Sequence, residues 1–260
     1  MNKFFIMTRG RTGSTAIVDV LNKTKSVHTT REQEIFLRHE FPQIRKNFPD
    51  LKNYPSTLPF ELWKTQTPKW WSYLPYRRMD AWLINRYLQD AEKLAMQEGV
   101  GAFGFKVLSN HFDENPSLKG TLLACGYRVL YLKRNVPHQV ISGMIAKQRG
   151  VYNTKKDFQD DTRYILDIDE FKKLVEWEAQ SVARDLELLR SSGFNFIEVT
   201  YEEFMADREA FFVRVLAFLG VPPEVPQASS YSVMIKDLKH TVENYQAVAE
   251  CAATMGMSIE

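Results

Sequence analysis

"KFFIMTRGRTGSTAIVDVL" (residues 3–21) joins an apolar run, a glycine-containing turn and a helical pattern without interruption. In the run at 3–8 the hydrophobic residues are mostly consecutive, which is typical of a strand buried on both faces of a parallel sheet. Residues 14–24 continue with the pattern of a helix. A strand, a turn and a helix in this order present backbone amides and the positive end of a helix dipole to an anion.

The turn itself has the composition of a phosphate site. It contains two arginines, two glycines and three hydroxyl residues, which are Arg9, Gly10, Arg11, Thr12, Gly13, Ser14 and Thr15. The glycines let the backbone approach an anion and adopt positive φ, and Arg11 places a full charge at the tip. An ordinary turn capped by Ser14 would explain one glycine and one hydroxyl, but it would not explain two arginines. We therefore predict that residues 9–15 bind an anion.

The rest of the chain alternates between apolar runs and helical patterns. Further strands are predicted at 101–108, 127–134 and 194–201. Helices are predicted at 79–99, 137–150, 169–193, 202–220 and 241–256. Strands that alternate with helices favour an α/β fold with a central, mostly parallel sheet. Residues 39–77 break this rhythm with many aromatic residues and prolines. This insert predicts either a satellite core under a long loop or a wall that faces the substrate.

The composition narrows the class of protein. Hydrophobic residues are 44% and charged residues 25% of the 260, which is the balance of a globular protein. The formal net charge of +2 is too small to indicate a nucleic-acid partner, although it suits a site for a small anion. No apolar run approaches the ~18 residues of a membrane span, and the first apolar run is too short for a secretory signal. We expect a cytoplasmic protein.

The anion can be narrowed by comparison with the nucleotide triphosphate loop. That loop places Lys and then Ser or Thr after its last glycine, and its Mg²⁺ is held with help from an acid at the end of a later strand. Here Ser14 follows Gly13 directly, and the strand at 127–134 ends in the cations of "YLKRN". The sequence therefore predicts no metal site, and it favours a donor whose charge is met by side chains over ATP hydrolysis.

Two motifs carry a resemblance to a known family. "RTGST" (11–15) at the start of a helix resembles the 5′-phosphosulfate loop of the sulfotransferases. These enzymes move a sulfuryl group from 3′-phosphoadenosine 5′-phosphosulfate (PAPS) to a hydroxyl or amine and release the bisphosphate PAP. In "RNVPHQVIS", Arg134 ends a strand and Ser142 follows eight residues later, as in the motif that holds the 3′-phosphate. The resemblance implies that Arg134 and Ser142 bind that phosphate.

Further segments extend the resemblance over most of the chain apart from the aromatic insert. They are "GFKVLSN" (104–110), "VTYEEFMADREAFFVRVLAFLGV" (199–221) and "TVENYQAV" (241–248). The resemblance implies a three-layer P-loop-like fold, a single sulfotransferase domain over 1–260, and transfer to a hydroxyl of a small-molecule or carbohydrate acceptor. The basic glycine-rich stretch that eukaryotic members place over the 3′-phosphate is not seen. "IKDLKHT" offers Lys236 and Lys239 instead.

The resemblance also suggests the catalytic residues. Bacterial carbohydrate-type members use a glutamate after the first helix, followed by an apolar or aromatic pair, and "REQEIF" places Glu34 there. A solvated loop carboxylate is the alternative, and His28 and His111 are the reserve bases. Lys106 lies in an apolar strand, where a buried lysine needs a partner such as a sulfuryl or phosphate oxygen; a lysine that emerges at the edge of the sheet is the alternative. We predict that Glu34 accepts the proton of the acceptor, while Arg11 and Lys106 stabilise the leaving group.

Two other functions remain open at this stage. One is a P-loop kinase or nucleotide hydrolase with a degenerate phosphate loop, and the other is a nucleotide-binding module without catalysis. A fold alone does not separate them, because one fold hosts many chemistries. A homodimer is also compatible with the sequence.

Overall fold

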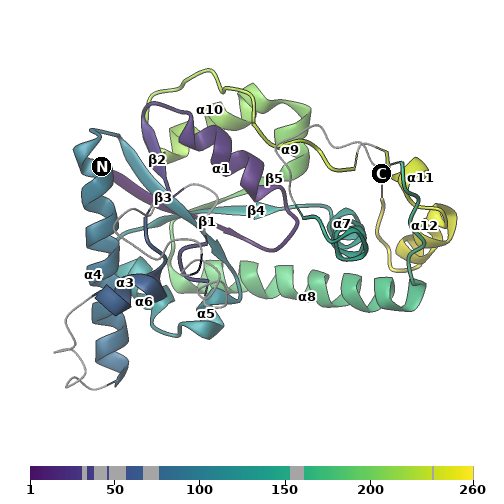
Figure 1. The fold of residues 1–260 in the computed structure, drawn as a ribbon, viewed down its shortest axis with the longest axis horizontal. Helices are drawn as coiled ribbons and strands as arrows, with labels where there is room; N and C mark the ends of the chain where they lie inside the picture. Colours follow the sequence, from purple (N-terminus) through teal and green to yellow (C-terminus); the bar gives the residue numbers. More distant parts are fainter. Residues whose placement is uncertain are drawn as a thin grey trace.

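The computed structural model describes residues 1–30, 34–37, 46, 57–66, 76–152, 161–235 and 237–259. Within them lies a sheet of five strands in the order β2-β3-β1-β4-β5, and every neighbouring pair is parallel (Figure 1). The strands are β1 Asn2–Thr8, β2 Val27–Thr29, β3 Ala102–Leu108, β4 Arg128–Lys133 and β5 Phe196–Thr200. The predicted α/β fold with a parallel central sheet is confirmed.

Helices cover both faces of this sheet and form the outer two of three layers. They are α1 Ser14–Asn22, α3 Phe60–Gln66, α4 Tyr76–Gln97, α5 His111–Glu114, α6 Leu118–Ala124, α7 Val136–Arg149, α8 Ile168–Ser192, α9 Tyr201–Ala206, α10 Arg208–Leu219, α11 Leu238–Thr241 and α12 Tyr245–Thr254. One face of β1 packs through Phe4 and Ile6 against α1, α9 and α10. The other face packs through Phe5 and Met7 against α4, α6 and the end of α8. In the described part of the chain, no helix is both long and apolar enough to cross a membrane.

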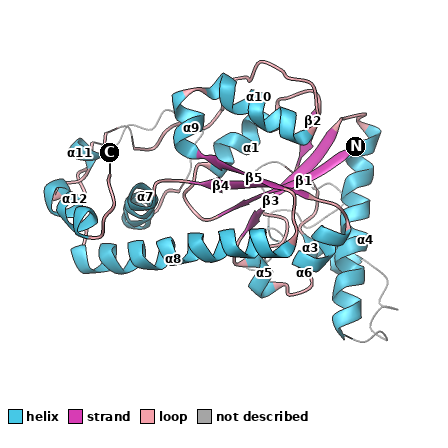
Figure 2. Ribbon diagram, turned by 180° about the vertical axis from the view of Figure 1, so that it is seen from behind, coloured by secondary structure: helices cyan, strands magenta, loops and turns pink. Residues whose placement is uncertain are grey.

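A third core cluster lies beyond the sheet and joins α7, α8 and the C-terminal helices. Figure 2 shows α8 running beneath the sheet and on past α7 to α12. Phe171 and Val175 of α8 are fully buried in this cluster together with Ile141 of α7. The long helix therefore links the sheet to the C-terminal region, and α7 lies between them.

The structure contains short elements that were not predicted, among them β2, α5 and α6, and it divides the helices predicted at 202–220 and 241–256, the second of them into α11 and α12. The short strand β2 at the edge of the sheet was not predicted, because three residues are too few to show a pattern. The helix predicted at 202–220 is two helices, since Asp207 has an extended backbone and caps α10 by accepting a hydrogen bond from the Ala210 amide at 2.9 Å. A polar residue inside an apolar helical pattern is compatible with such a break.

Only part of the aromatic insert belongs to the described residues. There, Phe60 of α3 packs against Phe36 at 5.6 Å and Tyr87 at 5.3 Å between ring centres. The Tyr87 hydroxyl donates a hydrogen bond to the Leu58 carbonyl at 2.6 Å. This part of the insert is joined to the main core. The prediction of a substrate-facing wall falls mostly on residues outside the described ranges.

The topology places the candidate site at the end of β1. Thr8 is level with Leu108 of β3 and with Leu132 of β4, so these three neighbouring strands end together. β1 has β3 on one side and β4 on the other, which makes its end the point where the strand order reverses. In open parallel sheets, ligands bind in the crevice at such a point.

Candidate active site

The loop after β1 is shaped for an anion by its own backbone. Gly13 caps α1 with φ of 77°, and Arg11 also has positive φ, at 65°. The buried Thr12 hydroxyl lies 2.5 Å from the Thr8 hydroxyl and 3.1 Å from the Arg9 carbonyl, which fixes the turn. A non-glycine residue at positive φ is uncommon and tends to occur at functional sites.

The amides of this loop are available to a ligand. Among the described residues, the backbone N–H groups of residues 11–15 have no hydrogen-bond partner, and neither has the Ser14 hydroxyl. The first intrahelical bonds of α1 begin only at Ala16 and Ile17, whose amides bond to the Gly13 carbonyl. Unpaired amides at a helix start carry partial positive charge and bind phosphates.

Tyr201 at the start of α9 braces the loop. A Cβ atom on Gly13 would lie 2.3 Å from two carbons of the Tyr201 ring, so only glycine fits there. The Arg134 guanidinium lies 4.6 Å from the centre of the same ring and donates a hydrogen bond to the Arg11 carbonyl at 3.1 Å. The loop, the end of β4 and the end of β5 are thus held together by these three side-chain and backbone contacts.

Arg11 connects the two predicted phosphate motifs. Its Nε and Nη2 donate to the Ser142 hydroxyl at 3.4 and 3.3 Å, and its Nη1 donates to the Tyr152 carbonyl at 2.6 Å. Burial, and then the charges of Arg134 and Arg149, lower the pKa of Arg11. Burial also lowers the pKa of Arg134. A lowered arginine pKa means that the positive charge is poorly compensated, and a bound anion would compensate it.

Glu34 and Lys106 lie together at the edge of the same space. The Lys106 Nζ lies 2.7 Å from Glu34 Oε1, and the Lys106 side chain is only 7% exposed. Glu34 is held in place because the next two residues, Ile35 and Phe36, are buried in the core under the sheet. The partner of Lys106 in the ligand-free protein is thus this glutamate, where the sequence suggested a sulfuryl or phosphate oxygen.

The two reserve histidines lie in different environments. His111 Nε2 is 4.0 Å from Glu34 Oε2, and His111 Nδ1 accepts a hydrogen bond from the Leu108 amide at 3.3 Å. The acceptor role of Nδ1 leaves the proton of a neutral ring on Nε2, which faces Glu34. His28, in contrast, bonds to Glu98 at 2.6 Å and is level with Phe103 near the opposite end of the sheet.

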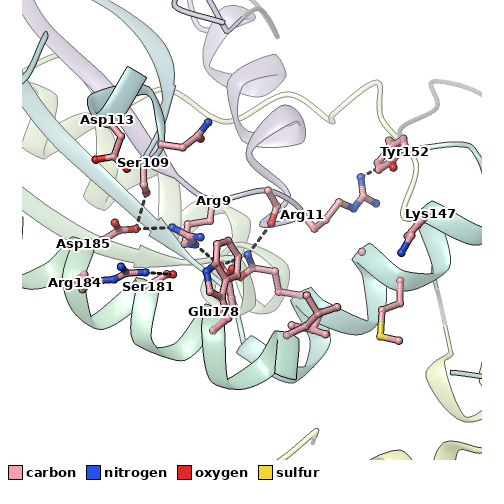
Figure 3. A pocket seen from close by; sticks show the side chains of 18 of the residues that line it. Arg9, Arg11, Ser109, Asp113, Lys147, Tyr152, Glu178, Ser181, Arg184 and Asp185 are labelled. Carbon is pink, nitrogen blue, oxygen red and sulfur yellow. Dashed lines mark hydrogen bonds and ion pairs between the residues drawn. The ribbon is translucent and has the colours of Figure 1, made fainter. Parts of the chain in front are cut away.

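Arg9 leaves the loop in a different direction from Arg11 (Figure 3). Its Nε lies 2.6 Å from Glu178 Oε1, its Nη1 lies 3.7 Å from Asp185 Oδ2, and its guanidinium lies 4.7 Å from the centre of the Trp177 ring. Burial raises the pKa of Asp185. The arginine therefore ties the loop to α8, and its charge is already paired.

Two cavities meet at the loop. The smaller, of about 280 Å³, is lined by the phosphate loop, Glu34, Lys106 and Arg134, and also by Ser229 and residues 231–235. The larger, of about 730 Å³, lies between α7, α8 and the segment after β3 (Figure 3). Arg9, Gly10, Arg11 and Tyr152 line both. The wall of the larger cavity combines apolar side chains such as Met144 and Trp177 with charged ones.

The segment 228–235, part of which lines the smaller cavity, is held by α1. Asp19 accepts hydrogen bonds from the Ser230 amide at 2.6 Å, the Ser229 hydroxyl at 3.2 Å and Lys23 at 3.0 Å. Lys23 also donates to the Ala228 carbonyl at 2.8 Å. We call the segment 228–235 the strap. Its contact with α1 was not predicted, because the residues that form these hydrogen bonds are more than 200 positions apart. Of the two lysines suggested for the C-terminal part, Lys239 lies over the Tyr245 ring at 5.8 Å, and Lys236 lies outside the described ranges.

The comparisons with known proteins agree with the family suggested by the motifs. A model described as "Sulfotransferase family" matches residues 3–225. The chain belongs to the sulfotransferase family. Its membership supports an enzyme that transfers sulfuryl groups, and no group of three or more metal-ligating residues is seen in the described part.

Several solved structures are similar at low identity. A sulfotransferase from Alicyclobacillus acidocaldarius is 15% identical with a TM-score of 0.45 over 97% of this chain and 93% of that one. Sulfotransferase STF9 from Mycobacterium avium is 15% identical with a TM-score of 0.46 over 98% and 76%. Mouse sulfotransferase SULT7A1 in complex with PAP is 14% identical with a TM-score of 0.43 over 86% and 60%. No curated protein sequence matches significantly.

Proposed function

We propose that the protein transfers a sulfuryl group from PAPS to a hydroxyl of a small-molecule or carbohydrate acceptor, in line and without a metal ion. The observation that carries this proposal is the meeting of the two phosphate motifs, because Arg11 contacts Ser142 directly and Arg134 holds the Arg11 carbonyl. Two poorly compensated arginines beside a row of available amides suit a ligand with two phosphate groups. The family of the chain supports the same conclusion.

We expect charge to orient the donor in the site. The amides of residues 11–15 and the Ser14 hydroxyl would hold the 5′-phosphate, to which the sulfuryl group is attached. Arg134 and Ser142 would hold the 3′-phosphate, since they lie at the end of β4 and on the facing turn of α7. Hydrogen bonds between charged groups of this kind contribute about 1.5–3 kcal/mol each.

The chemical step needs a proton acceptor and charge stabilisation. The acceptor oxygen attacks sulfur, the bond from sulfur to the bridging oxygen breaks, and PAP leaves with the electron pair. Glu34 takes the acceptor proton, since it lines the same cavity as the loop. Lys106, 2.7 Å from Glu34, and Arg11 would meet the charge that develops on the bridging oxygen. The protein then supplies mainly position and electrostatics.

The larger cavity gives the acceptor room. It shares the loop residues Arg9, Gly10 and Arg11 with the smaller cavity, so the body of an acceptor would lie in the larger cavity while its hydroxyl extends past the loop to Glu34 in the smaller one. Its volume of about 730 Å³ is within the range of small-molecule sites. The mixed lining suits an acceptor with an apolar or ring-shaped body and polar groups.

Thermal melting tests the donor. PAP at about 100 times its dissociation constant should stabilise the fold by roughly 2.7 kcal/mol in the presence of EDTA. A shift with ATP and Mg²⁺ but none with PAP would favour the kinase or hydrolase alternative and overturn the proposal. Binding of PAP without turnover of PAPS, over a broad acceptor panel, would favour the non-catalytic module.

The placement of the 3′-phosphate has its own test. Arg134→Ala should weaken PAP tenfold to a hundredfold, from the loss of about 1.5–3 kcal/mol. Adenosine 5′-phosphosulfate, which has no 3′-phosphate, should lose much less. An equal loss of affinity for the two ligands would mean that Arg134 does not bind the 3′-phosphate.

A further inference from the structure

Arg208, the first residue of α10, lines the smaller cavity and has an unsatisfied donor. Its Nε is buried without a hydrogen-bond partner. Within the described ranges it forms no ion pair, whereas Arg214 of the same helix pairs with Glu203 at 2.8 Å. A buried N–H group without a partner costs free energy, about 1–3 kcal/mol. The contrast between the two arginines points to a ligand contact at Arg208.

The aromatic row along this wall places Arg208 away from the phosphate motifs. Its guanidinium lies 5.2 Å from the centre of the Phe204 ring, and Phe204 lies 6.0 Å from Tyr201, whose ring carries Arg134 at 4.6 Å. The row therefore runs from Arg134 through two aromatic rings to Arg208. Arg134 is at one end of this row, beside the phosphate motifs, and Arg208 is at the other end, separated from Arg134 by the two rings.

The part of the donor that remains for this end is the purine. Both phosphates are assigned to the loop and to the Arg134 motif, and the purine is an uncharged planar ring with acceptor nitrogens. A guanidinium held on an aromatic face can stack on a second planar ring and donate to its nitrogens. The same cavity is also lined by Tyr231 and Ser232 of the strap segment.

We propose that Arg208 binds the nucleobase of the donor, with its guanidinium supported by Phe204. The proposal rests on the proposed function, because it takes PAPS as the ligand. It adds a base contact to a site in which the loop amides and Arg134 are assigned to the two phosphates. The charge of Arg208 is then used for orientation of the base and not for the leaving group.

Titration of three ligands by calorimetry tests the assignment. Arg208→Met keeps an apolar side chain on Phe204 but removes the charge and the N–H donors. It should weaken PAP by about threefold to thirtyfold, and it should weaken adenosine 5′-phosphate by the same factor. Ribose 3,5-bisphosphate, which has no base, should bind both proteins equally. Arg214→Met is the matched control, since that arginine is exposed and paired with Glu203.

The outcomes separate this assignment from the proposed function. If the wild-type protein does not bind PAP, both fail. If the wild-type protein binds PAP and Arg208→Met binds it equally well, only the assignment of Arg208 fails. Equal weakening of PAP and ribose 3,5-bisphosphate would make Arg208 a phosphate ligand and also overturn it. If Arg208→Met does not fold, Arg208→Lys gives the same test, because lysine lacks the planar group that stacks and should lose affinity for the two base-containing ligands only.

Discussion

Gly13→Ala should damage the donor site through Tyr201. Gly13 has φ of 77°, and an added methyl group would lie 2.3 Å from Cδ2 and Cε2 of Tyr201. The ring therefore has to move or the loop has to shift. Since the Tyr201 ring also carries the Arg134 guanidinium at 4.6 Å, either movement displaces the group that we assign to the 3′-phosphate.

The expected magnitude has two parts. A non-glycine residue in the left-handed region costs about 1–2 kcal/mol, and overpacking of a fitted contact costs about 1–3 kcal/mol more. At about 2–4 °C per kcal/mol for a chain of this size, the melting temperature should fall by roughly 4–20 °C. Loss of the Arg134 contact with Tyr201, worth about 0.5–2 kcal/mol, should weaken PAP by about twofold to thirtyfold.

Gly193→Ala is the matched control. Gly193 follows α8 with φ of 79°, and an added Cβ there would meet nothing within 4 Å. It therefore carries only the backbone cost, and PAP affinity should be unchanged. Melting curves and PAP titrations of the two variants measure the difference. Equal melting temperatures together with normal PAP affinity in Gly13→Ala would refute the role given to Tyr201.

Three further predictions follow from the contacts of single side chains. Arg11→Ala should abolish turnover without unfolding the protein. Arg9→Ala should lower stability by about 1–3 kcal/mol, because it leaves Glu178 without its ion-pair partner, and it should leave PAP affinity nearly intact. If turnover assays and melting curves show the opposite effects for the two variants, Arg9 is the residue that binds the anion. Glu34→Gln should lower kcat by about 10²–10⁴-fold with PAP affinity unchanged. Near-normal turnover of this variant would mean that another group is the base. Burial opposes ionisation of Asp19, but hydrogen bonds outweigh it and lower the pKa of Asp19 below its usual value of 3.8. The ionised carboxylate therefore stabilises the fold above pH 3.8, and this stability is lost as the pH falls through the folded-state pKa. The melting temperature of Asp19→Asn should therefore fall less in acid than that of the wild-type protein, and an equal fall would contradict this.

Several parts of the site could be predicted from sequence because they are local. The phosphate loop depends on a strand, a turn and a helix that follow one another, and the structure has β1, the turn and α1 at those positions. The spacing from Arg134 to Ser142 spans one strand end and two helical turns. Glu34 was expected from a motif, and the burial of Ile35 and Phe36 explains why an apolar pair follows it.

Other parts depend on contacts between distant segments. The strap over the smaller cavity needs Asp19 and Ser230, and nothing near either residue indicates the other. Tyr201 lies where the predicted strand 194–201 meets the predicted helix 202–220, but its contact with Gly13 depends on the position of β5 in the sheet. His28 and His111 are equivalent in sequence terms, and only the fold places His111 within 4.0 Å of Glu34.

The two loop arginines show why residue type does not fix a role. Arg9 is surrounded by Glu178 and Asp185, so its burial is compensated within the protein. Arg11 and Arg134 are partly buried near one another, with hydroxyl, carbonyl and aromatic-ring partners but no ion pair among the described residues, and burial lowers the pKa of both. Desolvation of a cation without a counter-charge costs free energy in the ligand-free protein. Fold stability does not favour such an arrangement, whereas binding of an anion does, because the ligand supplies the missing charge. Removal of Arg11 should therefore cost the ligand-free protein less stability than removal of Arg9, even though it costs the enzyme its activity.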